Sequence, residues 1–145
     1  MPKKEVSIIV PSKVPVVALC SPAWGIEVLL DRARAVSKGD KFVLLLRSGD
    51  GIEGRILPAY LNAYVRYREG NMRSDSLPIE LMLFIAGTLN IGKAIREYGA
   101  KEGSGLLVIA SDEALLGKFI MGNGLKEKER PALSIGGKGF HPVLQ

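Results

Sequence analysis

The segment from Leu77 to Ala86 constrains the fold more than any other part of the chain, because it is apolar on nearly every side of the helix that its spacing predicts. Ser76 is a suitable N-cap, and Gly87 with Thr88 interrupts the pattern. A second, amphipathic helix follows, defined by four apolar residues and a closing glycine: Ile91, Ala94, Ile95, Tyr98 and Gly99. A helix that is apolar all round must be central, so we expect the first of this pair to lie in the core.

Two more helices are predicted before this pair and one after it. Apolar residues at helical spacing run from Ile26 to Val36 and stop at Lys38-Gly39, and a second pattern runs from Gly54 to about Gly70. Pro58 is acceptable in the second of these because it falls in the first turn. The last helix is expected to begin with Ser111 as its N-cap and to carry Leu115, Leu116, Phe119 and Ile120.

Short apolar or β-branched runs predict strands at residues 6–10, 14–19, 42–46, 106–110 and 132–135. Three consecutive helices stand between two of these strands, which does not fit a regular repeat of strand, helix and strand. The sequence therefore predicts an α+β domain with a small mixed or antiparallel sheet packed against several helices.

The 145 residues, 47% of them hydrophobic, are enough to bury one core, and we expect residues 1–145 to form a single domain. The start of the sequence lacks the apolar core of a signal peptide, which predicts a cytoplasmic protein. Pro78 and Glu80 interrupt the longest apolar stretch well short of the roughly 20 residues that a membrane span needs, so we expect no membrane partner.

The sequence has one cysteine and one histidine, which limits the metal sites and catalytic sites that it can form. Cys20 and His141 cannot supply the four ligands of a structural zinc site, so no metal is expected, and Cys20 is expected to be a small buried residue. His141 lies in a glycine-rich tail, where a catalytic base would be hard to hold. The run 136–139 lacks the spacing of a phosphate-binding loop. We expect no cofactor and no catalysis, with a small enzyme using Lys, Asp or Glu as an alternative.

Glu80 stands alone in an apolar helix and has two interpretations. It is either a carboxylate in the first turn that faces the helix N-terminus, which is the expectation, or a buried acid with a raised pKa. Arg73 is the nearest arginine in sequence that could accompany it.

Arginines cluster around the second helix, at positions 47, 55, 66, 68 and 73, with Tyr60, Tyr64 and Tyr67 among them. The net charge of +5 also favours an anionic partner. Arginine contacts phosphates, and tyrosine or guanidinium planes stack on unpaired bases, so this mixture suits RNA. The competing interpretation is a solvated helix face with Tyr64 in the core. The candidate RNA-binding residues are Arg73, Arg66, Arg68, Arg55, Lys93 and Arg96.

The stretch from Ser76 to Gly99 joins Ser-Leu, a glutamate before an apolar run, a short break, and an Ile-x-x-Ala-Ile helix that ends in glycine. Upstream, Ile52-Glu-Gly with Leu57 is similar to an Ile-x-Gly-x-x-His-Leu element. In these features the chain resembles the small kinase-binding subunits of the KEOPS complex, the PRPK-binding protein family, over roughly residues 25–110. The sequence departs from the family at Ile56 in place of histidine and at Leu89 in place of arginine, and residues 136–145 leave no room for the long final helix of the family.

This resemblance implies a non-catalytic, archaeal-like accessory subunit of the machinery that installs threonylcarbamoyladenosine beside the anticodon of tRNAs. It also implies two partners, which are the single-stranded 3′ CCA end of tRNA and the atypical kinase/ATPase subunit of the complex. Arg73, just before the matched helix, is the first candidate for an RNA contact. The alternative function is a general protein-protein interaction module whose basic surface meets an acidic protein.

Overall fold

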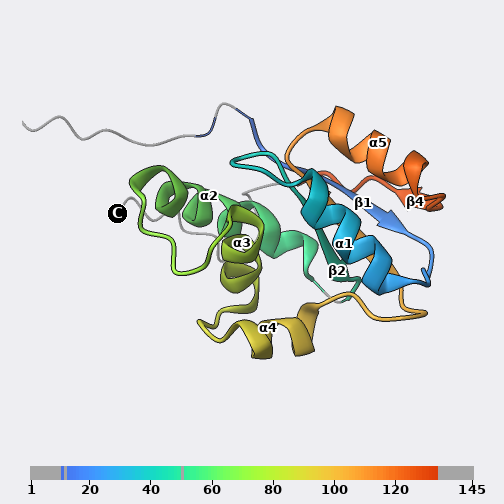
Figure 1. The fold of residues 1–145 in the computed structure, drawn as a ribbon, viewed down its shortest axis with the longest axis horizontal. Helices are drawn as coiled ribbons and strands as arrows, with labels where there is room; N and C mark the ends of the chain where they lie inside the picture. Colours follow the sequence, from blue (N-terminus) through green and yellow to red (C-terminus); the bar gives the residue numbers. More distant parts are fainter. Residues whose placement is uncertain (1–10, 12, 50, 134–145) are drawn as a thin grey trace, which may run out of the picture.

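The computed structural model describes residues 11, 13–49 and 51–133 (Figure 1). The elements in chain order are β1 (Val16–Cys20), α1 (Ile26–Val36), β2 (Val43–Arg47), α2 (Glu53–Glu69), α3 (Leu77–Ala86), α4 (Ile91–Tyr98), β3 (Leu106–Ala110), α5 (Glu113–Gly122) and β4 (Glu127–Glu129). The four strands form one sheet in the order β2-β3-β1-β4, and each neighbouring pair is antiparallel. The α+β prediction is confirmed, and of its two alternatives for the sheet the antiparallel one is right.

Helices cover both faces of the sheet (Figure 1). Leu107 and Ile109 of β3 pack with residues of α2, α3 and α4, whereas Leu106, Val108 and Ala110 pack with residues of α1 and α5. Side chains alternate between the two faces of a strand, so a strand that is covered on both sides must be apolar throughout. This explains why β3 reads as an unbroken apolar run with every residue buried.

Helix α3 packs against α2, α4 and strand β2, which is the central position that its sequence predicts. Leu81 and Ile85 are buried in the same cluster as Ile56 of α2 and Leu46 of β2. The Ser76 hydroxyl accepts a hydrogen bond from the backbone N–H of Ile79 at 3.4 Å, as expected for its N-cap. The C-cap of the helix is Gly87, whose φ of 69° is a conformation that a side chain would strain.

None of the helices in the described ranges is by itself long and apolar enough to cross a membrane. Helices α3 and α4 reach that length and composition only together, and the chain bends by 71° between them.

Three features near the ends of the chain differ from the predictions or cannot be compared with them. Asp112 rather than Ser111 caps α5, because its Oδ1 accepts the N–H of Leu115 at 2.8 Å while the Ser111 hydroxyl accepts the N–H of Phe42 at 3.0 Å. Strand β4 was not predicted, and residues 132 and 133 of a predicted strand are not in a strand. The rest of that strand, the strand at 6–10, the 136–139 run and His141 lie outside the described residues.

Candidate nucleic-acid interface

Two cavities border the 71–76 segment that joins α2 to α3. The first, of about 220 Å³, lies between this segment and the turn after α1. The second, of about 300 Å³, lies between α2, the same segment and the end of α3. We call the second one the arginine cleft; it is lined by Arg66, Arg73, Glu80, Leu83, Phe84, Gly87, Thr88 and Leu89.

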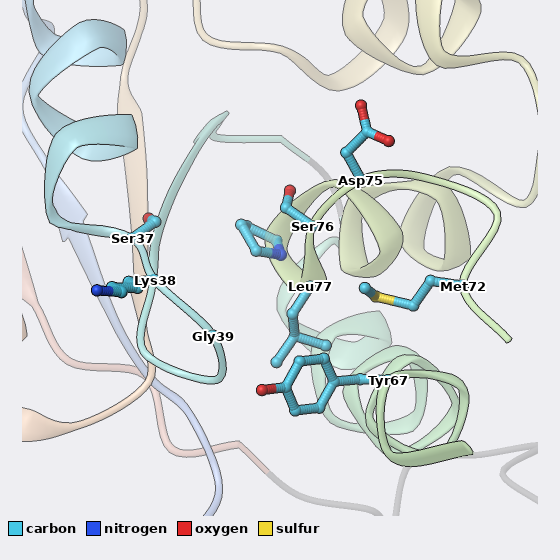
Figure 2. A pocket seen from close by; sticks show the side chains of 9 residues that line it. Ser37, Lys38, Gly39, Tyr67, Met72, Asp75, Ser76 and Leu77 are labelled. Atoms are coloured by element: carbon cyan, nitrogen blue, oxygen red, sulfur yellow. The ribbon is translucent and has the colours of Figure 1, made fainter. Parts of the chain in front are cut away.

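The first cavity lacks polar groups that converge on a ligand. Figure 2 shows that the Lys38 ammonium and the Asp75 carboxylate both point away from its middle. The Ser37 hydroxyl is already used, because it donates to the Ala33 carbonyl at 2.7 Å. A ligand site needs a few polar groups that meet at one place, so the arginine cleft is the better candidate.

Arg66 comes from the last turns of α2 and forms one wall of the arginine cleft. Its guanidinium carbon lies 5.4 Å from the ring centroid of Phe84, and Nη1 donates to the Asn71 carbonyl at 3.4 Å. Its Nε lies 4.0 Å from the Glu80 carboxylate. Arg66 and Phe84 are both half-buried, so a guanidinium and part of an aromatic ring reach the surface together.

Arg73 enters the same cleft from the loop before α3, and its side chain is exposed. Its backbone N–H donates to the Glu80 carboxylate, at 3.1 Å to Oε1. The arginine accompanying Glu80 with its guanidinium is therefore Arg66, not Arg73 as sequence distance indicated. Arg66 and Arg73 lie seven positions apart in sequence, and the packing of α2 against α3 places them in one cleft.

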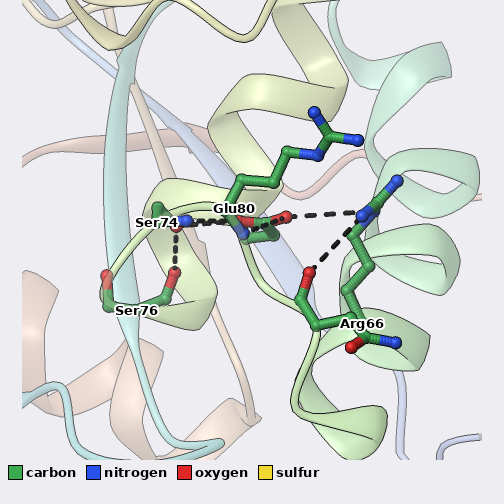
Figure 3. Close-up of polar contacts among 6 residues, drawn as sticks. Arg66, Ser74, Ser76 and Glu80 are labelled. Atoms are coloured by element: carbon green, nitrogen blue, oxygen red, sulfur yellow. Dashed lines mark hydrogen bonds and ion pairs between the residues drawn. The ribbon is translucent and has the colours of Figure 1, made fainter.

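Glu80 is the only buried charged residue in the described part of the chain, with 2% of its surface exposed. It lies in the first turn of α3, as expected, but the expectation of a carboxylate that simply faces the helix end is incomplete. Figure 3 shows the carboxylate turned to the loop, where it accepts hydrogen bonds from Ser74.

The other candidate residues on α2 lie outside the arginine cleft. Arg55, at the start of the helix, donates to the Tyr98 hydroxyl at 2.8 Å and so joins α2 to α4. Arg68 lies over the ring of Tyr64, with 5.9 Å between the guanidinium carbon and the ring centroid, and donates to its hydroxyl at 3.2 Å. Both side chains have partners in the protein and do not line the cleft.

Lys93 and Arg96 are exposed on α4, which begins two residues after the cleft residue Leu89. Neither lines the cleft. Arg47, which sequence proximity grouped with the other arginines, donates to the backbone carbonyl of Glu97 at the other end of α4. The predicted basic stretch therefore divides over several surfaces, and Arg66 with Arg73 is the pair that meets in a cavity.

Two of the three tyrosines of α2 pack in the core instead of presenting a plane for stacking. Tyr60 and Tyr64 are buried, which makes the competing interpretation right for Tyr64. Burial raises the pKa of Tyr60 to about 12. The aromatic side chain available in the cleft is Phe84, which the sequence did not single out because it lies within the apolar run of α3. Its packing against Arg66 depends on the tertiary contact between α2 and α3.

Cys20 is buried as predicted, and burial raises the pKa of its thiol to about 11. A thiol with this pKa is protonated near neutral pH and is a poor nucleophile. Within residues 13–49 and 51–133, no group of three His, Cys, Asp or Glu side chains is placed to hold a metal ion.

No family model and no curated protein matches the sequence.

Proposed function

We propose that this protein is a non-catalytic RNA-binding subunit whose arginine cleft holds the unpaired 3′ CCA end of tRNA. The observation that carries the proposal is the meeting of Arg66 and Arg73, from a helix and from a loop, in one cleft that the half-buried ring of Phe84 also lines. Guanidinium groups bind phosphates, and both guanidinium and aromatic planes stack on bases.

The size and lining of the cleft favour unpaired nucleotides over a duplex. A cavity of about 300 Å³ is at the small end of ligand sites and admits a base but not a double helix. Leu83 and Leu89 add apolar surface beside the two arginines. Sequence-specific RNA recognition mostly targets bases that are not paired, because their faces and edges are then accessible.

The resemblance supplies the biological setting of this proposal. A KEOPS accessory subunit in the cytoplasm would take part in tRNA threonylcarbamoyladenosine modification without performing the transfer itself. The two single-residue departures from the family have different consequences in the structure. Ile56, at the family's histidine position, is fully buried, whereas Leu89, at an arginine position, lines the cleft and leaves Arg66 and Arg73 as its cations.

The proposal is tested by filter binding of tRNA with and without its CCA end across a salt series. We call the ratio of the two affinities the end preference. Stacking of unpaired bases contributes about 1–3 kcal/mol per base, so intact tRNA is expected to bind at least tenfold more tightly. The affinity should fall as salt rises, because phosphate contacts release counterions. Equal affinity for the two tRNAs would remove the CCA end from the function.

A second surface favours a protein partner, for which we propose the atypical kinase/ATPase subunit. Ile91 and Ile95 are 40% and 51% exposed and lie one turn apart on α4. Lys93 and Arg96 are exposed on the same helix. Apolar side chains gathered beside cations are typical of a protein contact with an acidic rim. The same surface serves the alternative function of a general interaction module.

The variant Ile95→Glu is expected to lose copurification of the kinase subunit from co-expressing cells, because it places a charge in the apolar part of the α4 surface. Val28→Glu on α1 is the matched control, since Val28 is 53% exposed on the opposite side of the sheet. Copurification of the kinase with both variants would exclude the α4 surface as the contact.

A further inference from the structure

We infer that Glu80 is a positioning residue that fixes both arginines of the cleft and thereby creates the end preference. This inference rests on the proposed function of the arginine cleft. Glu80 does not itself need to touch RNA, because it is buried beneath the surface that Arg66 and Arg73 present.

Glu80 makes two sets of contacts, and the first set holds the loop that carries Arg73. Oε1 of Glu80 accepts the N–H of Arg73 at 3.1 Å, the N–H of Ser74 at 3.0 Å and the Ser74 hydroxyl at 2.8 Å (Figure 3). Hydrogen bonds to a carboxylate are stronger than those between neutral groups, particularly where water is excluded. The backbone of the loop is thereby tied to the first turn of α3.

The second set of contacts holds the side chain of Arg66. Its Nε lies 4.0 Å from Oε2 of Glu80, while its guanidinium carbon lies 5.4 Å from the ring centroid of Phe84. Glu80 and Phe84 are one turn apart on α3, so a single rigid helix sets the position of this arginine through two contacts. Residues of α3 therefore hold the backbone of Arg73 and the guanidinium of Arg66, although neither arginine belongs to α3.

Helix stability alone does not account for a carboxylate at this position. Ser76 already caps the helix, and the other buried residues of α3 are all apolar. Removing a charge from water is costly, and an apolar side chain at such a site is often as stable as an ion pair. A buried carboxylate that contacts both the loop and Arg66 is better explained by the geometry it imposes on the cleft.

Charge and position predict opposite effects when the carboxylate is neutralised. Glu80 places a negative charge in a site for a polyanion, so neutralisation would strengthen the binding of every RNA if long-range charge were its main effect. If position is its main effect, neutralisation releases Arg66, and the end preference falls even where general affinity rises. Measuring the end preference therefore distinguishes an effect of charge from an effect of position.

The decisive variant is Glu80→Gln, which has nearly the same shape. Its amide oxygen can still accept from Ser74, but its NH₂ group faces the Nε–H of Arg66 and cannot pair with it. We expect the end preference to fall by about tenfold, because Arg66 loses the attraction of a buried carboxylate whose Oε2 lies 4.0 Å from its Nε. Glu69→Gln is the matched control, because it removes one exposed carboxylate of α2 outside the cleft.

A second variant, Ser74→Ala, removes the hydrogen bond from the Ser74 hydroxyl to Glu80 without changing α3. It is expected to lower the end preference severalfold, and it keeps the test valid if Glu80→Gln does not fold. An unchanged end preference in folded Glu80→Gln, or in folded Ser74→Ala where only that variant folds, overturns the inference. The proposed function fails instead if the wild-type protein shows no end preference. If Arg66→Ala loses the preference and the folded test variant keeps it, only the role of Glu80 is wrong.

Discussion

Replacing Arg66 and Arg73 together by alanine is expected to lower the affinity for intact tRNA about 100-fold and to abolish the end preference. Each guanidinium contributes phosphate contacts and a stacking plane, and losing one such contact costs about 1–3 kcal/mol. The slope of log affinity against log salt should become shallower by about two, because two cations no longer displace counterions. Filter binding across the same salt series measures both effects.

The matched control for this double variant is the pair Lys118→Ala and Lys128→Ala. Both lysines are exposed, on α5 and β4, and neither lines the arginine cleft. The control makes the same change in net charge. A difference in affinity between the two double variants therefore depends on where the charges lie and not on how many are removed. If the control and the double variant lost the same affinity, binding would be diffuse and the cleft would not be the site.

Truncating Leu81 to alanine is expected to destabilise the fold by about 2–5 kcal/mol, the usual cost of removing a fully buried leucine. Leu81 is 0% exposed and lies in the cluster that joins α3 to α2 and the sheet. Domains of this kind are stable by only about 5–15 kcal/mol in total, so this single change removes a large part of the stability.

Chemical denaturation measures the effect of Leu81→Ala, with Ile95→Ala as the control. Ile95 is 51% exposed on α4, so its truncation should change the free energy of unfolding by no more than about 0.5 kcal/mol. A midpoint for Leu81→Ala that matches the control would contradict the central position of α3.

The helices and the apolar strands were predictable because their patterns match local geometry. Leu77 to Ala86 is apolar and buried nearly all round, and Leu106 to Ala110 forms an interior strand of the sheet. Strand β4 was missed because its residues, Glu127 to Glu129, are charged and exposed. It exists through pairing with Leu19 and Cys20, which no local pattern indicates.

The candidate site was predictable in its residue types and less so in its grouping. Sequence proximity grouped five arginines, but the direction of each side chain on α2 depends on which face the helix buries. Arg66 and Arg68 are two residues apart and point to different partners, Phe84 and Tyr64. The role of Glu80 depends on the path of the 71–76 loop, which is set by tertiary packing rather than by a sequence pattern.

The most direct test of the central claim uses two RNA hairpins that differ only at their 3′ end. One carries an unpaired CCA end, and in the other the 5′ strand is extended so that the same CCA is base-paired. If the arginine cleft receives unpaired nucleotides, pairing lowers the affinity of the wild-type protein although it adds phosphates. Equal or tighter binding of the paired hairpin would contradict the account.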